Sequence, residues 1–149
     1  MVIKLVVLGN IKEKYYRNLI EEYSALIKKK YSFEIIELKD ESIPRNAKES
    51  IMNSIKECEG DKVLAHISSS DYVVALCIEG KKTDSEKLKK VINHATQRGV
   101  NNIIFVIGGS LGLSDKVVKR ADYRLSFSDM TFPHQLMRVM LMEQLALLP

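Results

Sequence analysis

Apolar and polar positions along the chain change between two periods, and this change predicts the order of its elements. The run V-I-K-L-V-V-L at 2 to 8 is rich in β-branched residues and is typical of a buried strand. The stretch that follows places Leu19, Tyr23 and Ile27 at helical spacing. The chain is therefore predicted to begin with a strand followed by a helix.

The same order recurs along the rest of the chain. Further strands are predicted at 33 to 38, 71 to 78, 102 to 107 and 123 to 127. Ser114 and Asp115 are typical of a helix start, and Pro133 is predicted as the first residue of the last helix. The apolar faces of the second and third helices are predicted to be Ile51, Ile55 and Cys58, and Leu88, Val91, Ile92 and Ala95.

This alternation predicts an α/β fold. Near-continuous apolar strands separated by helices are typical of a mainly parallel sheet with helices on both faces, here of about five strands. The content of 46% hydrophobic and 28% charged residues suits a sizeable core. No linker or repeat divides the chain, so residues 1–149 are predicted to form one domain.

Charge, cysteine content and hydropathy limit the partners and the cellular compartment that the sequence predicts. The 23 Lys and Arg exceed the 19 Asp and Glu, which permits an acidic partner such as RNA without demanding one. Cys58 and Cys77 are too far apart for a C-x-x-C pattern, and with no secretory signal we expect core thiols in a reducing cytoplasm. No apolar run reaches the ~20 residues of a spanning helix, so no membrane partner is predicted.

Three turns between a strand and the next helix are unusual in composition. Ligands of parallel α/β sheets bind outside the carboxyl ends of the strands, so these turns are the places to look for function. They are L-C-I-E-G-K at 76 to 81, I-G-G-S-L-G-L-S at 107 to 114 and S-F-S-D-M-T-F-P-H-Q at 126 to 135.

The glycine-bearing turn leaves two interpretations open. Its pattern G-G-x-x-G matches neither the dinucleotide fingerprint nor the P-loop, which disfavours a nicotinamide or nucleoside triphosphate site. Gly108, Gly109 and Gly112 let the backbone approach a flat adenosine-like group closely. The same glycines are equally compatible with a tight turn that leads into the next helix.

The turn after the last strand also has two interpretations. A capped helix start explains Thr131 and Pro133. It does not call for Ser126, Ser128 and His134 beside them, and these side chains favour a loop that contacts a ligand.

Together these segments resemble a known family. The runs F-V-I-G-G-S-L-G-L (105 to 113), L-S-F-S-D-M-T-F-P-H-Q-L-M-R-V-M-L-M-E-Q (125 to 144) and L-C-I-E-G-K (76 to 81) resemble the large-subunit (23S) ribosomal RNA pseudouridine N3-methyltransferases of the SPOUT class. The resemblance covers nearly the whole chain. It implies a C-terminal trefoil knot, S-adenosyl-L-methionine as cofactor, and methylation of N3 of a pseudouridine in large-subunit rRNA.

The resemblance also implies the residues of the site. The positions that match the family's cofactor-binding residues are Leu76, Gly108, Phe127, Ser128, Asp129, Met130, Thr131 and Phe132. Their predicted ligand is S-adenosyl-L-methionine, held by backbone groups and covered by apolar side chains.

His134 and Arg138 are the candidate catalytic residues. They lie near the predicted pocket in sequence, where a base that deprotonates the nucleobase would be needed. His134 at a helix start can equally cap or pack the helix. His66 and His94, on predicted helices, are expected to be structural or solvated, and they form no metal-ligand pattern with the cysteines.

The expected partners are large-subunit rRNA and a second copy of the chain, with no DNA partner. Lysine-rich segments border the predicted pocket and favour RNA contact, although a solvated helix face is the alternative. These segments are residues 81 to 90 and Lys116, Lys119, Arg120 and Arg124. The last helix is apolar almost all round, which favours a homodimer with a shared site.

One departure from the family pattern follows the last motif. Family members usually continue past E-Q with a basic tail that carries Tyr and His, whereas this chain reads L-A-L-L-P. The resemblance therefore leaves two alternatives open. The protein could be a SPOUT methyltransferase of another RNA, or a cofactor-binding, rRNA-associated protein with weak activity.

Overall fold

The computed structural model describes residues 1–148 and contains five strands that alternate with five helices, as the sequence predicts. The strands are β1 (Val2–Leu8), β2 (Ser32–Leu38), β3 (Tyr72–Lys82), β4 (Asn102–Ile107) and β5 (Tyr123–Ser126). The helices are α1 (Lys14–Lys28), α2 (Glu49–Leu64), α3 (Ser85–Gln97), α4 (Asp115–Arg120) and α5 (His134–Leu147).

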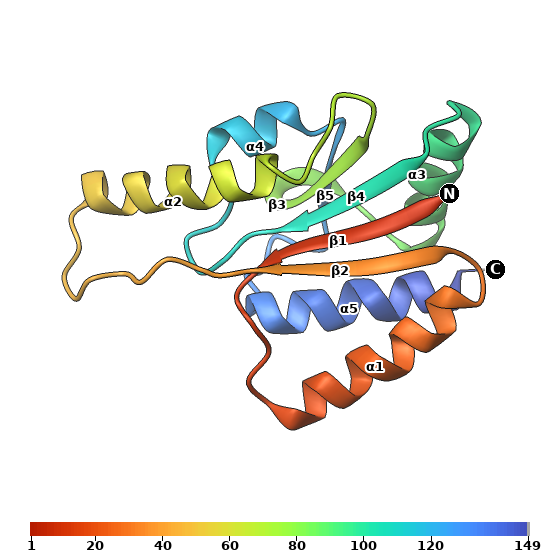
Figure 1. The fold of residues 1–149 in the computed structure, drawn as a ribbon, viewed down its shortest axis with the longest axis horizontal. Coiled ribbons are helices and arrows are strands. Elements are labelled where there is room, and N and C mark those ends of the chain that lie inside the picture. Colours follow the sequence, from red (N-terminus) through yellow and green to blue (C-terminus); the bar gives the residue numbers. More distant parts are fainter. Residues whose placement is uncertain (149) are drawn as a thin grey trace.

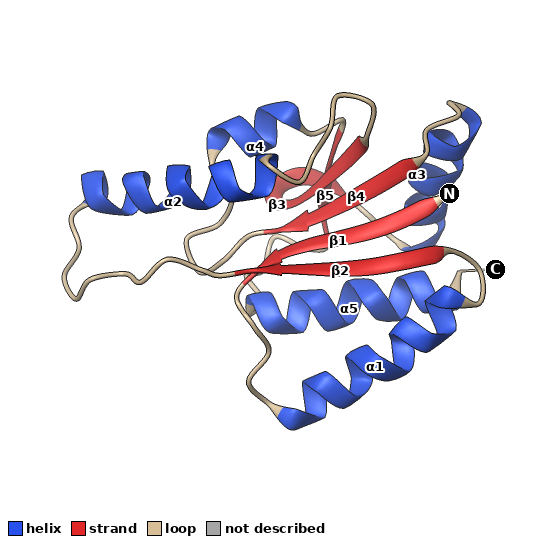
Figure 2. Ribbon diagram, in the orientation of Figure 1, coloured by secondary structure: helices blue, strands red, loops and turns tan. Residues whose placement is uncertain are grey.

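The strands form one sheet in the order β2-β1-β4-β3-β5, and every pairing is parallel (Figures 1 and 2). Helices α2 and α4 cover one face, and α1, α3 and α5 cover the other. The predicted fold class, a parallel α/β sheet with helices on both faces, is confirmed. The trefoil knot stays a prediction.

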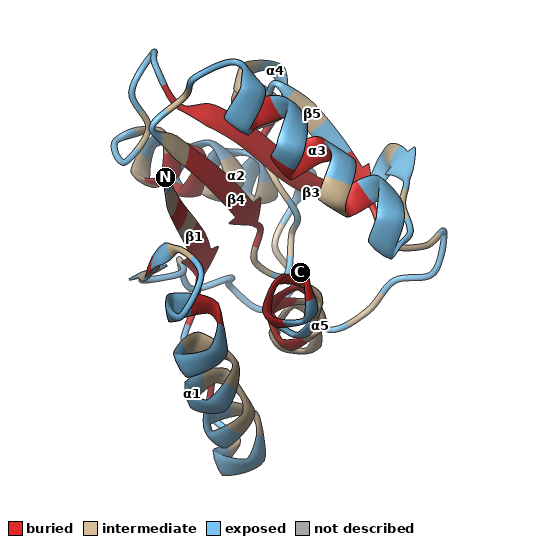
Figure 3. Cartoon of the chain, turned by 90° about the vertical axis from the view of Figure 1, so that its right-hand side faces the viewer, coloured by how far each residue is buried: buried red, intermediate tan, exposed pale blue. Residues whose placement is uncertain are grey.

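The alternation of side chains along each strand divides the core into two layers. Ile3, Leu5 and Val7 of β1 belong to the cluster under α1, α3 and α5, whereas Val6 and Leu8 belong to the cluster under α2 and α4. Both faces of the central strands are thus buried, as Figure 3 shows. This double burial explains why the strands read as continuous apolar runs.

Helix α2 departs from its predicted packing. Its buried residues are Glu59, Gly60 and Val63, whereas Ile51 and Cys58 are exposed. Only the second half of α2 lies over the sheet and α4, and its first half extends beyond them (Figure 1). The predicted buried positions of Ile51 and Cys58 are therefore wrong, whereas Ile55 is partly buried.

Strand β3 is longer than predicted. Residues 76 to 81, expected as a turn, still belong to β3 and pair with β5 across a bulge. Leu125 is the partner of both Leu76 and Lys81. A Cβ on Gly80 would lie 2.8 Å from the backbone N of Leu125, so glycine permits this close approach. The chain turns later, and Asp84 accepts a 2.8 Å hydrogen bond from Lys87 N at the start of α3.

Helix α5 packs on the sheet with one side and on α1 with another. Val139, Leu141 and Leu145 are buried, and Tyr23 Oη of α1 lies 3.2 Å from Glu143 Oε2. The α1 contact therefore accounts for part of the apolar surface that the sequence places around this helix. Within residues 1–148, no helix has both the length and the apolar character needed to cross a bilayer.

Candidate functional site

The register of the sheet brings Leu76, in the middle of β3, level with the carboxyl ends of the neighbouring strands β4 and β5. Ala75 of β3 pairs with Val106 of β4, and Leu76 pairs with Leu125 of β5. Leu76 is therefore level with the last residues of β4 and β5, and the glycine turn and the Ser-rich turn begin at this level. This edge is where parallel α/β sheets bind ligands.

The glycine turn is a tight turn closed on itself. Gly112 N donates to Gly109 O over 3.0 Å, and Gly112 has a φ of +82°. A Cβ on Gly108 would lie 2.7 Å from the carbonyl carbon of Gly112. Gly108 is thus required by the chain's own packing, so the tight-turn interpretation is confirmed, and contact with a cofactor remains a prediction.

The Ser-rich turn also holds its own backbone. Ser126 Oγ donates to Ser128 O over 3.0 Å, and Ser128 Oγ accepts from Met130 N over 3.0 Å. The Asp129 carboxylate lies 2.5 Å from Lys82 Nζ, which ties the turn to the end of β3. The hydroxyls that the sequence singled out therefore shape this loop.

The remaining predicted positions of this loop differ in exposure. Phe127 and Phe132 are partly buried, whereas Met130 and Thr131 are exposed. Pro133 is the N-cap of α5 rather than its first helical residue, because its ψ of 137° is not helical.

The chemistry of this edge fits an adenosine-like cofactor. Ile78, two residues after Leu76 in β3, and Met130, in the Ser-rich turn after β5, are large apolar residues that are 48% and 67% exposed. No atom outside the turn lies within 4 Å of a Cβ position on Gly112, so its backbone can be approached. Apolar side chains beside accessible backbone groups are typical of sites for flat small molecules.

A cavity of about 300 Å³ lies next to this edge, between the start of α3 and the middle of α5. Of the predicted cofactor positions it contacts only Phe127. Ser85 Oγ and Gln144 Oε1, on its two walls, form a 2.5 Å hydrogen bond. The cavity is therefore a neighbour of the predicted cofactor edge rather than the same site.

Arg138 is buried at the ends of β1 and β2. It is 2% exposed, and its two terminal nitrogens donate to Glu37 Oε2 over 2.8 Å and to Gly9 O over 2.9 Å. Burial lowers the pKa of its guanidinium, and the hydrogen bond and charge of Glu37 raise it part of the way back. The side chain stays charged and holds α5 against the two strands.

His134 shares the space over Gly9 with an acidic residue, Asp40, that the sequence interpretation missed. A Cβ on Gly9 would be 3.8 Å from His134 Nε2 and 3.6 Å from Asp40 Oδ2, so both side chains lie over Gly9. Gly9 has a φ of +90°, which a side chain rarely adopts. The glycine directly after a strand was the only local signal for this arrangement.

The other histidines are apart from this cluster. His66 is exposed in the turn after α2, not on a helix, and His94 is exposed on α3. Within the described part of the chain, no group of three or more His, Cys, Asp or Glu residues is placed to hold a metal ion.

The five-stranded parallel sheet with helices on both faces is consistent with the fold of SPOUT methyltransferases. Residues 1–146 match the family described as "Predicted SPOUT methyltransferase", and the chain therefore belongs to the SPOUT methyltransferase family.

The names of individual relatives are more specific than the description of the family. The chain is 51% identical over 145 residues to "Ribosomal RNA large subunit methyltransferase H" of Clostridioides difficile (strain 630). Proteins of the same name from Clostridium novyi (strain NT) and Streptococcus thermophilus (strain ATCC BAA-491 / LMD-9) are 49% and 50% identical. Each alignment covers 97% of this chain and 91% of the relative.

Proposed function

We propose that the protein transfers a methyl group from S-adenosyl-L-methionine to N3 of a pseudouridine in large-subunit ribosomal RNA. The observation that carries the proposal is the alignment of Leu76, the glycine turn and the Ser-rich turn at one edge of a SPOUT-family sheet. Relatives that are about half identical are named as large-subunit rRNA methyltransferases, which supports the RNA class.

The proposed cofactor site is made by Leu76 of β3, Gly108 after β4 and the six residues from Phe127 to Phe132 after β5. The bound cofactor supplies an already activated methyl group on a sulfonium. N3 would give its proton to a base, for which His134 is the candidate, and its lone pair would take the methyl group as the S–C bond breaks and S-adenosylhomocysteine is released. The protein's main contribution is to hold the N3 lone pair in line with the methyl carbon.

The two candidate catalytic residues are assigned different roles in this proposal. His134 is partly exposed and shares the space over Gly9 with Asp40, which supports contact between its imidazole and the nucleobase or the departing proton. Arg138 has both terminal nitrogens bonded within the chain, which supports a positioning role at the start of α5.

A cytoplasmic homodimer is part of the proposal. Leu136, Met137 and Met140 of α5 are only partly buried although α1 and the sheet cover the helix, which supports a further apolar contact. Light scattering tests it. A dimer that dissociates in the Met137→Lys/Met140→Lys variant supports the shared interface, and a monomeric wild-type protein contradicts it.

Methyl transfer tests the proposed reaction directly. Ribosomes from a strain that lacks the modification are incubated with the protein and S-adenosylmethionine labelled in the methyl group, and mass spectrometry locates the label. Label on a pseudouridine of the large subunit supports the proposal. If calorimetry shows cofactor binding but no rRNA is methylated, the proposed reaction is contradicted and only the proposed cofactor site is supported.

A further inference from the structure

A second hollow lies on the molecule away from the proposed cofactor edge. It has a volume of about 230 Å³ and lies between α3 and the first residues of β3 and β5. Its walls are Tyr72, Lys87, Lys90, Val91, His94 and Tyr123. We call it the α3 groove.

Each tyrosine of the α3 groove has a cation over its ring. Lys81 Nζ is 5.8 Å from the ring centroid of Tyr123, and the Arg98 guanidinium carbon is 5.6 Å from that of Tyr72. Burial, and then the charge of Asp122, raise the pKa of the Tyr72 phenol, while Arg98 opposes them. The groove therefore combines neutral aromatic rings with cationic groups.

Two of the cations around the α3 groove lie over aromatic rings, and none has a carboxylate within 4 Å in residues 1–148. In residues 1–148, Lys81, Lys87, Lys90 and Arg98 form no ion pair. Of the nearby carboxylates, Asp122 is paired with Arg120 and Glu86 is the direct neighbour of Lys87 on α3. The charge of the groove is therefore free to meet an external anion.

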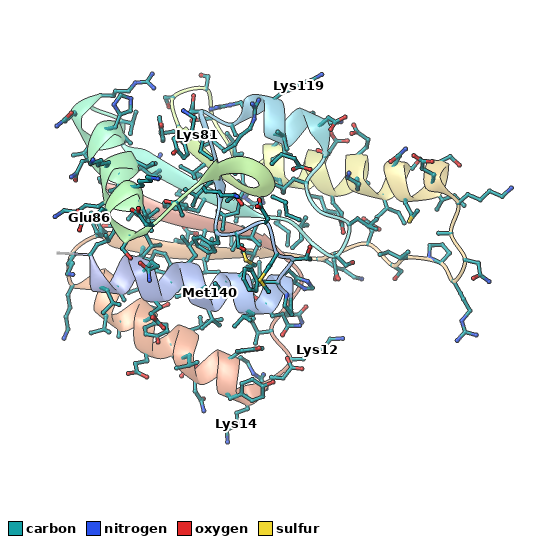
Figure 4. All side chains as sticks on the ribbon, turned by 180° about the vertical axis from the view of Figure 1, so that it is seen from behind. Lys12, Lys14, Lys81, Glu86, Lys119 and Met140 are labelled. Carbon is teal, nitrogen blue, oxygen red and sulfur yellow. The ribbon has the colours of Figure 1, made fainter. Side chains whose placement is uncertain are left out.

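Other cations that the sequence placed near RNA are engaged within the chain. Lys82 pairs with Asp129, and Lys116 lies 2.9 Å from Glu57 and 2.7 Å from Asp61. Figure 4 shows Lys81 on the same upper side of the molecule as Lys119, with Lys12 and Lys14 at the start of α1 below the sheet. Lys82 and Lys116 are therefore less available to an external anion than the cations of the α3 groove.

We propose that the α3 groove binds the sugar-phosphate backbone of the RNA substrate, an inference that rests on the proposed function. Lys87, Lys90 and Arg98 contact phosphates, and the partly exposed Tyr123 supports a sugar or an unstacked base. The carboxylates of an acidic peptide would pair with the cations but would not stack on the tyrosine rings, as nucleobases do. The tyrosines therefore favour RNA over an acidic peptide.

The α3 groove lies close enough to the cofactor edge to orient the substrate. Tyr123 and Ser126 are the two ends of β5, so about 10 Å of strand separates the groove from the Ser-rich turn. RNA held in the groove therefore runs beside the reacting nucleotide.

The test compares two triple variants with the same change of charge. Lys87→Gln/Lys90→Gln/Arg98→Gln alters the groove, and Lys28→Gln/Lys29→Gln/Arg45→Gln alters exposed cations of α1 and of the segment before α2. The probe is a large-subunit rRNA fragment, with affinity measured at several salt concentrations. Circular dichroism checks folding, and calorimetry checks cofactor affinity.

We expect the groove variant alone to lose affinity about tenfold or more, and its salt slope to fall by about 2, since each single-strand phosphate contact contributes ~0.7. Cofactor affinity should not change. Equal affinities and slopes for the two variants would overturn the inference, whether or not an acidic peptide binds instead. If the wild-type protein binds the RNA but transfers no methyl group, the proposed function is overturned, while RNA binding by the α3 groove is not.

Discussion

The guanidinium of Arg138 lies 2.8 Å from the carboxylate of Glu37, which is 101 positions earlier in the chain. The same guanidinium donates to the carbonyl oxygen of Gly9 over 2.9 Å. One buried side chain thus ties the start of α5 to the carboxyl ends of β1 and β2. The position of His134, one turn earlier on α5, depends on this tie.

Replacing Arg138 should therefore destabilise the protein. In Arg138→Gln the carbonyl of Gly9 loses a buried donor, at a cost of about 1 to 3 kcal/mol. The Glu37 side chain is 47% exposed, so water can solvate its carboxylate in the variant. The loss of the ion pair with Arg138 therefore adds little to the cost. Urea unfolding measures the change, with exposed Arg45→Gln as the control. Equal unfolding free energies for the two variants would contradict the structural role.

The two adjacent glycines of the glycine turn should respond differently to alanine. The Cβ of Gly108→Ala would lie 2.7 Å from Gly112 C, whereas that of Gly109→Ala would meet its nearest neighbours at 3.7 Å. Thermal unfolding should show a lower Tm for Gly108→Ala than for Gly109→Ala. If both variants melt alike, the turn is more plastic than its geometry indicates.

The contact between α2 and the start of α4 predicts a rescue. A Cβ on Gly60 would lie 2.2 Å from Ser114 Oγ, the hydroxyl that caps α4. Gly60→Ala should therefore lose about 1 to 2 kcal/mol in spite of its better helix propensity. In a Ser114→Gly background the clash is removed, and the same alanine should be neutral or stabilising. A double-mutant cycle without coupling would rule out this contact.

Asp71 should make the stability depend on pH. Burial opposes its ionisation, but hydrogen bonds from Ser68 N and Asn102 Nδ2, at 2.8 and 3.0 Å, lower its pKa below the ordinary value. The stabilisation is full above the unfolded pKa of about 4 and is lost as the pH falls through the lower folded value. The difference in unfolding free energy between wild type and Asp71→Asn should shrink from about pH 6 to pH 3. A constant difference, or the same trend in exposed Glu21→Gln, would contradict this assignment.

His134 can be tested as a residue that acts on the substrate. If it assists proton removal, His134→Ala should slow methyl transfer by about 100-fold or more while cofactor affinity stays nearly unchanged. His66→Ala, in the exposed turn after α2, is the matched control. Equal transfer rates for the two variants would leave His134 with a packing role only.

Local patterns determined the order and type of the elements. The alternation of apolar strands and amphipathic helices predicted the parallel α/β fold, and β4 has the bounds that were predicted for it. Ser114 caps α4 and the face of Leu88, Val91 and Ile92 is buried, as expected. These features depend on contacts within a few residues and on side-chain periodicity. Both can be read from the sequence of a single element without knowledge of its neighbours. The family resemblance, confirmed over residues 1–146, also rests on sequence.

Only the tertiary structure decided where these elements meet. β3 continues to Lys82 because β5 is beside it to pair with, and Cys58 is exposed because α2 buries the face of Glu59, Gly60 and Val63 instead. The pairing of Arg138 with Glu37 and the cations left unpaired around the α3 groove depend on segments far apart in the chain. Periodicity reports which face of an element is buried but not its neighbour, because that neighbour is chosen by the free energy of packing the whole chain.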